Sequence, residues 1–200
     1  MSAVERRPTR REMVVGTFAA AAGLALEADA PAVADTAAPS DTGLLSKALE
    51  VERLMVLAYR RVLASGALSP GVERAITPHL RHEVSHVTTL AARLARLGGS
   101  ASTAPLSLKA GGDALGRYHV SGSLTDLRTE HDCLKLLVDL ESVAEGVYYK
   151  ALKDLRHPGL VRLSAQIMAC EAQHWTVLSG LRNPGQYVKA VPWPYVYGSK

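Results

Sequence analysis

Residues 83–86 read Glu-Val-Ser-His and residues 171–174 read Glu-Ala-Gln-His, so one four-residue pattern occurs twice. Each copy follows, by 31 and 30 residues, a glutamate that has a tyrosine seven positions after it. Residues seven apart on a helix lie on one face. The sequence therefore contains a duplicated unit that keeps its polar residues in helical register. The preceding residues are Glu52 with Tyr59, and Glu141 with Tyr148.

Apolar periodicity around these motifs predicts four helices, over residues 44–65, 69–97, 123–155 and 160–181. Gly66 ends the first of them, and Ser69-Pro70 opens the second with a typical N-cap and first position. Residues 98–122 show no period and form a long connection. A long connection is needed if the third helix starts at the far end of the bundle. We predict an all-α, antiparallel four-helix bundle of two helical hairpins joined by one long crossover.

The repeated polar residues are expected at the same level along the bundle axis. In each hairpin the two glutamates lie nearly equal distances from the turn, and apolar residues surround them. Buried carboxylates are costly unless they are neutralised, and two divalent cations would neutralise them. Carboxylates with imidazoles suit iron or manganese, and zinc less specifically. The predicted metal ligands are Glu52, Glu83, His86, Glu141, Glu171 and His174.

Residues 44–182 resemble the ferritin-like superfamily, which includes bacterioferritins and rubrerythrins. The resemblance rests on the two Glu-x-x-His motifs, each preceded at matching distance by Glu-x6-Tyr. It implies that each histidine binds one metal ion and that each tyrosine hydrogen-bonds a carboxylate ligand without binding the metal itself. The implied terminal ligands are Glu52 and Glu141, the bridging ligands Glu83 and Glu171, the histidines His86 and His174, and the tyrosines Tyr59 and Tyr148.

The chain departs from the family pattern just before each Glu-x-x-His motif. Many members have an acid there that orients a ligand histidine, whereas this chain has His82 and Cys170. The change bears on metal affinity and redox tuning. Glu145, one turn after Glu141, is open to three interpretations: an extra ligand, a gate or a solvated side chain, and we expect the last. His79 either enters the site, lines an access path or is a partly buried structural histidine, and we expect the last.

The two cysteines are expected to be buried free thiols. Cys170 adjoins Glu171, whereas Cys133 lies eight residues before Glu141. If the two glutamates are level, the cysteines lie roughly 10 Å or more apart along the bundle, beyond the reach of a disulfide.

The N-terminus has the three regions of an export signal. Residues 9–14 (Thr-Arg-Arg-Glu-Met-Val) resemble a twin-arginine motif, the apolar stretch 13–26 is too short for a permanent membrane span, and Ala32-Val33-Ala34 offers a cleavage site. We predict a signal over residues 1–34, a linker over 35–43, and export to the periplasm, cell envelope or exterior. The alternative is a retained N-terminal helix that lies on a membrane. Residues 183–200 are predicted to form an extended tail.

Composition and net charge limit the classes of function that we expect for this chain. The formal net charge is +4, and no basic cluster interleaved with aromatic residues occurs, so nucleic acid is not an expected partner. Our hypothesis is an exported dinuclear protein, with iron first and manganese second as the metal, that reacts with dioxygen or peroxide. Ferroxidase and peroxide-scavenging activities both fit, as does a homo-oligomer. The alternative is a non-catalytic envelope or stress-protection scaffold without redox turnover.

Overall fold

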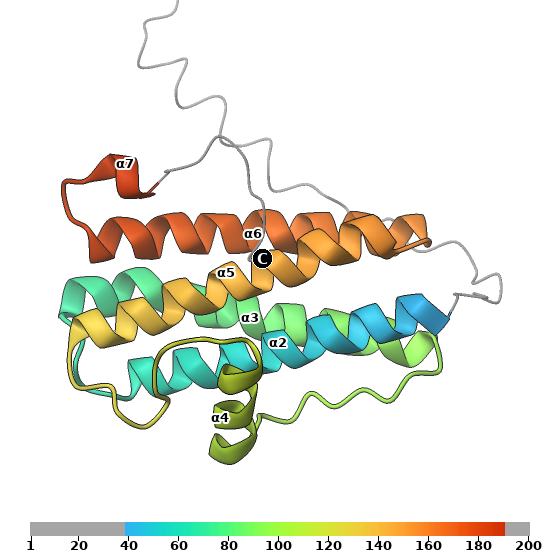
Figure 1. Cartoon of the computed structure of the whole chain (residues 1–200), viewed down its shortest axis with the longest axis horizontal. Helices are drawn as coiled ribbons and strands as arrows, with labels where there is room; N and C mark the ends of the chain where they lie inside the picture. The colour runs from blue at the N-terminus through green and yellow to red at the C-terminus, as the bar shows by residue number, and fades with distance from the viewer. Residues whose placement is uncertain (1–38, 191–200) are drawn as a thin grey trace, which may run out of the picture. The chain divides into compact units, whose positions relative to one another are not determined.

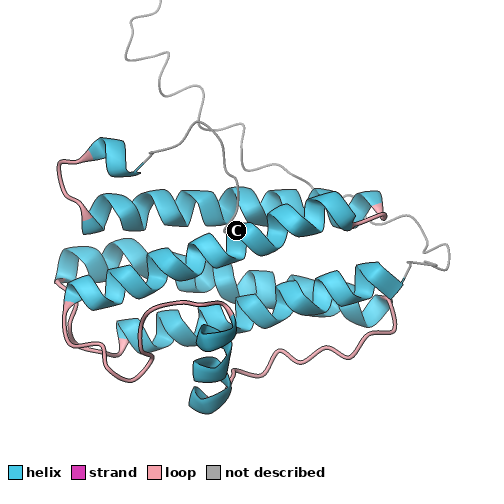
Figure 2. Ribbon diagram, in the orientation of Figure 1, coloured by secondary structure: helices cyan, strands magenta, loops and turns pink. Residues whose placement is uncertain are grey.

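The computed structural model describes residues 39–190, which form helices and loops without strands (Figures 1 and 2). α2 packs against α3 and α5 against α6, and the two hairpins meet through α2 with α5 and α3 with α6. This arrangement confirms the predicted all-α bundle of two hairpins. The connection from α3 to α5 runs along the outside of α2 (Figure 1). The helices are α2 (Pro39–Leu63), α3 (Pro70–Arg96), α4 (Leu108–Arg117), α5 (Glu130–Asp154), α6 (Pro158–Arg182) and α7 (Tyr187–Ala190).

The ends of α3 follow from local chemistry. Ser69 is the extended N-cap residue and Pro70 takes the first position, where a missing N–H costs no hydrogen bond. At the other end Gly98 has a φ of +73°, a conformation that glycine adopts without strain. The N-cap and the proline at the first position were predicted from the sequence.

α2 begins at Pro39, before the predicted start at Leu44, so the predicted linker of residues 35–43 overlaps its first turns. Asp41 in the first turn is buried, and its carboxylate accepts hydrogen bonds of 3.1 Å from the backbone N–H groups of Arg156 and His157. The residues between α5 and α6 therefore hold the start of α2 in place. Periodicity alone gives no sign of such a long-range contact.

We expect Asp41→Ala to lower the free energy of unfolding by about 1–3 kcal/mol, because it leaves two backbone N–H groups without their acceptor. Urea denaturation in the presence of a chelator measures this loss apart from any metal effect. Asp41→Asn keeps one oxygen acceptor and should lose less. Equal stability of all three proteins would show that this carboxylate does not hold the turn.

The crossover contains a helix that the sequence did not predict. α4 is capped by Ser107, whose side chain accepts a hydrogen bond from the Ala110 N–H. Three glycines weaken the helical pattern of this segment, and one of them has a packing role. A Cβ atom on Gly111 would lie 2.5 Å from Leu57 Cδ2, so glycine allows α4 to approach α2 closely. Arg53 and Arg61 on α2 also hold the crossover, by hydrogen bonds to backbone carbonyls.

α5 begins later than predicted. Ser123 was expected to open it, but the Ser123 hydroxyl instead accepts hydrogen bonds from the N–H groups of Thr125 and Asp126 in a turn. The helix starts at Glu130, where Thr129 and Asp132 form a capping box. Two sequences with capping potential lie close together here, and the second is used.

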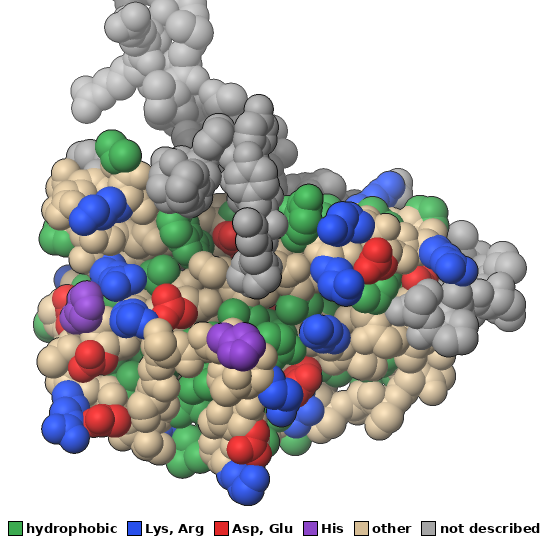
Figure 3. Space-filling view, in the orientation of Figure 1, with side chains coloured by type: hydrophobic (Ala, Val, Ile, Leu, Met, Phe, Trp, Pro, Cys, Tyr) green, Lys and Arg blue, Asp and Glu red, His purple; other side chains and the backbone are tan. Residues whose placement is uncertain are grey.

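The described part of the C-terminal segment includes α7, a single turn where an extended tail was predicted. The signal at residues 1–34, its cleavage after Ala34 and the tail residues 191–200 lie outside the described residues. Among residues 39–190, no helix combines the length and apolar character needed to cross a membrane. Basic and acidic side chains are interspersed over the face shown in Figure 3.

Candidate metal centre

The six predicted ligands come together inside the bundle. Each of the four glutamates is completely buried, with 0% of its surface exposed, and each comes from a different helix. The two histidines lie one turn after the glutamates of α3 and α6, so they point into the same interior. The glutamates are Glu52 on α2, Glu83 on α3, Glu141 on α5 and Glu171 on α6.

His86 faces three of these carboxylates through one ring nitrogen. Its Nδ1 lies 2.9 Å from Glu171 Oε1, 3.4 Å from Glu52 Oε2 and 3.5 Å from Glu83 Oε2. The imidazole and three carboxylates thus surround one small volume.

His174 repeats the arrangement on the other side. Its Nδ1 lies 2.9 Å from Glu83 Oε1, 3.2 Å from Glu171 Oε2 and 3.5 Å from Glu141 Oε1. Glu83 and Glu171 therefore contact both histidines through opposite oxygens, whereas of the two histidines Glu141 contacts only His174 and Glu52 only His86. The same division into shared and unshared carboxylates is what the family resemblance implies for bridging and terminal ligands.

The donor atoms form two compact groups, each with three carboxylates and one imidazole, and within each group they all lie within 4.8 Å of one another. Oxygen-rich sets of this kind, with one imidazole, suit a divalent iron or manganese ion. The first group is Glu52, Glu83, His86 and Glu171, and the second is Glu83, Glu141, Glu171 and His174.

Six of the buried donor atoms in these two groups have close neighbours but no hydrogen bond of acceptable geometry. A buried polar atom without a hydrogen bond costs about 1–3 kcal/mol, and more when it is charged. A cation would provide each of them with a partner. The residues present therefore fit a pair of metal ions. The atoms without a hydrogen bond are Glu52 Oε2, both oxygens of Glu83, His86 Nδ1, Glu141 Oε2 and Glu171 Oε1.

Without metal, the centre holds protons. Burial, and then the charge of Glu171, raises the pKa of Glu52 and of Glu141 well above the ordinary value. Burial alone would lower the pKa of His86 and His174, but contacts with Cys170 and the glutamates outweigh it and raise both pKa values. A metal ion that enters must displace these protons.

Glu171 has the opposite shift. Burial would raise the pKa of this carboxyl, but its contacts with His174 and His86 prevail and lower the pKa to about 2. Glu171 therefore stays ionised more readily than Glu52 and Glu141.

The two tyrosines reach across the bundle. Tyr59 Oη, on α2, donates a hydrogen bond of 2.5 Å to Glu141 Oε1 on α5, and Tyr148 Oη, on α5, donates one to Glu52 Oε1 on α2. Each tyrosine therefore holds the unshared carboxylate of the other hairpin. The sequence predicted carboxylates as their partners but not this reciprocal crossing.

His79 is buried beside the centre. Its Nδ1 lies 3.2 Å from Tyr59 Oη, and its ring stacks on His174 with centroids 4.2 Å apart. Burial, followed by the charge of His174, lowers the pKa of His79 to about 4, so the ring is neutral near pH 7. It contacts the proposed ligand His174 directly, but it belongs to none of the candidate metal groups within residues 39–190.

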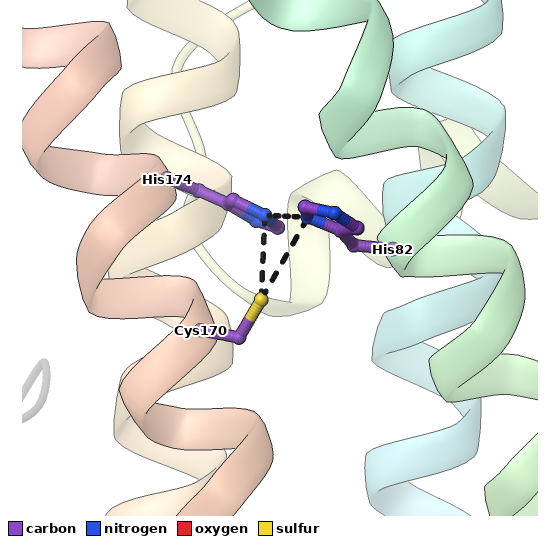
Figure 4. Close-up of side chains that lie close together, drawn as sticks. All are labelled: His82, Cys170 and His174. Carbon is purple, nitrogen blue, oxygen red and sulfur yellow. Dashed lines mark hydrogen bonds between the residues drawn. The ribbon is translucent and has the colours of Figure 1, made fainter. Parts of the chain in front are cut away.

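His82 and Cys170 form a third candidate group with His174, which the sequence analysis missed (Figure 4). His82 Nδ1 lies 2.9 Å from His174 Nε2, and Cys170 Sγ lies 3.5 Å from the same nitrogen. These two residues were noted only as departures from the family pattern. Their equivalent positions, one residue before each Glu-x-x-His motif, were the signal that they would meet.

Two further expectations concern single residues. Glu145 is half-buried rather than solvated, and burial, followed by the charge of Glu171, raises its pKa to about 7. It belongs to none of the three candidate metal groups among the described residues. Cys133 and Cys170 are both free, as predicted, although only Cys133 is fully buried.

Comparison with known proteins agrees with this architecture. A family model described as a ferritin-like domain matches residues 40–184, which is most of the chain and all four bundle helices. Searches of curated proteins and of solved structures found no match. With the bundle and its paired carboxylate–histidine groups, the match over residues 40–184 shows that the chain belongs to the ferritin-like domain family.

Proposed function

We propose that this protein binds two iron or manganese ions in the carboxylate–histidine centre and reacts with dioxygen or peroxide. One observation carries the proposal: Glu83 and Glu171 each face both histidines, so two ions would share two carboxylates. The four glutamates also balance the charge of two divalent ions. When bound, such a pair of ions supplies Lewis acidity and the electrons for reduction of dioxygen or peroxide.

The protein would keep the centre dry and hold its carboxylates in position. All four glutamates are fully buried, which strengthens electrostatic contacts with an ion. The hydroxyls of Tyr59 and Tyr148 fix the unshared carboxylates, as outer partners fix metal ligands elsewhere. Tyr59 Oη donates its single proton to Glu141 Oε1, so the neutral His79 ring donates from Nδ1 to the same oxygen and holds the hydroxyl in position.

The location and the assembly are part of the proposal. The twin-arginine-like motif at residues 9–14 supports export, and this route carries folded proteins, so the centre could be filled before export. Membership of the ferritin-like family supports a homo-oligomer. Ferroxidase and peroxide-scavenging reactions are the two activities that we propose for the centre.

Oxygen uptake on addition of ferrous iron to metal-free protein tests the proposed activity, with peroxide consumption by the manganese-loaded protein as the parallel assay. We expect turnover in the native protein and a loss of about 100-fold or more in Glu83→Ala, since even an outer partner of a metal ligand contributes 10–100-fold. Glu73→Ala removes an exposed carboxylate from the same helix and should have no effect. A folded protein that shows neither reaction would favour the scaffold alternative.

A further inference from the structure

A second kind of metal-binding chemistry lies directly beside the carboxylate centre. His82 and Cys170 occupy equivalent places in the two copies of the repeat, immediately before Glu83 and Glu171. The pairing of α3 with α6 brings both side chains to the outer edge of the His174 ring (Figure 4). The two positions at which the chain departs from its family therefore meet in space.

The three side chains offer one sulfur and two nitrogen atoms. His174 takes part through Nε2, while its Nδ1 faces the glutamates, so the ring would lose its N–H proton and bridge the two centres when both hold metal. The ring planes of His82 and His174 are 9° from parallel, and His82 Nδ1 lies 2.9 Å from His174 Nε2. Cys170 Sγ lies 3.5 Å from one of these nitrogens and 3.9 Å from the other.

These distances fit a tetrahedral metal site. With Zn–S of about 2.3 Å and Zn–N of about 2.0–2.1 Å, tetrahedral angles place sulfur about 3.5 Å from each nitrogen and the nitrogens about 3.3 Å apart. The observed separations therefore need to change by only about 0.4 Å. His82 is exposed and can make that movement, whereas His174 is fixed in the core.

We propose that His82, Cys170 and His174 bind one thiophilic metal ion, of which Zn²⁺ is the representative, at a site beside the carboxylate centre that shares His174 with it. A thiolate with two imidazoles prefers such an ion over the oxygen-seeking ions suited to the glutamates. Because His82 is exposed and Cys170 half-buried, the ion would be reached from solvent. Three protein ligands leave a fourth position for water or another small ligand, as in open zinc sites.

Titration of the full-length metal-free protein with Co²⁺, a spectroscopic substitute for Zn²⁺, tests this site. We expect a thiolate-to-cobalt charge-transfer absorption with the intensity of one thiolate-bound ion per chain, which disappears when Zn²⁺ is added. Cys170→Ser should abolish the absorption, and His82→Ala should weaken Co²⁺ binding by about 100-fold or more. Cys133→Ser, which alters the other free cysteine, should leave both unchanged.

Glu83→Ala separates this proposal from the proposed function. It should lose bound iron or manganese but keep the cobalt–thiolate absorption, because Glu83 is not part of the sulfur-containing group. Native protein with a helical circular dichroism spectrum but no such absorption would overturn the proposal and leave the three residues as a hydrogen-bonded cluster only. Absorption that persists in Cys170→Ser would overturn it as well.

Discussion

Saturation with manganese(II) is expected to raise the melting temperature by about 8–16 °C per bound ion over the metal-free protein. An ion whose free concentration is about one thousand times its dissociation constant stabilises the native state by about 4 kcal/mol. For a chain of this size, 1 kcal/mol corresponds to about 2–4 °C. The structural reason is that the buried centre contains six atoms without a hydrogen bond, which an ion would satisfy. Circular dichroism melts with chelator and with manganese measure the shift.

The double variant Glu83→Ala, Glu171→Ala is the control, and its melting temperature should not respond to manganese. In the native protein the shift should also shrink as the pH falls. The pKa values of His86 and His174 are raised, so their protons must leave for an ion to bind, and a lower pH favours the protonated, metal-free state. Equal melting temperatures with and without manganese in the native protein would contradict this prediction.

Removal of either buried tyrosine hydroxyl should weaken metal binding by about 10–100-fold, the usual cost of losing an outer partner of a metal ligand. The reciprocal crossing makes the two variants act on different ions. Tyr59→Phe removes the hydrogen bond to Glu141, which of the two histidines contacts only His174. It should therefore weaken binding of the ion beside His174. Tyr148→Phe frees Glu52 and should weaken the ion beside His86.

Competition of manganese with a chromophoric chelator resolves the two affinities. Tyr149→Phe is the matched control, because this neighbouring tyrosine is exposed and its ring lies under the Lys153 ammonium rather than beside a carboxylate. Native affinity for both ions in Tyr59→Phe and Tyr148→Phe would show that neither hydroxyl supports the centre.

The repeated motifs made the bundle and the convergence of its six polar residues predictable. Helical spacing fixes which residues share a face, and equal distances from a turn fix their height. The glutamates Glu52 and Glu83, far apart in sequence, could therefore be expected in one layer. Predicting this layer requires no knowledge of how the side chains pack.

The features that escaped prediction depend on contacts between elements. α4 carries three glycines that lower its helical signal, and the need for Gly111 becomes visible only when Leu57 lies beside it. The start of α2 depends on Asp41 reaching the residues between α5 and α6. The equivalent positions of His82 and Cys170 in the repeat were a signal, but predicting their contact also required knowing which faces of α3 and α6 pack together.

Elemental analysis of the protein, exported by its own signal and purified without chelators, tests the central claim most directly. We expect about two iron or manganese ions per chain, both lost in the Glu83→Ala, Glu171→Ala variant. A well-folded helical protein that contains neither metal, and binds neither when iron or manganese is supplied, would contradict it.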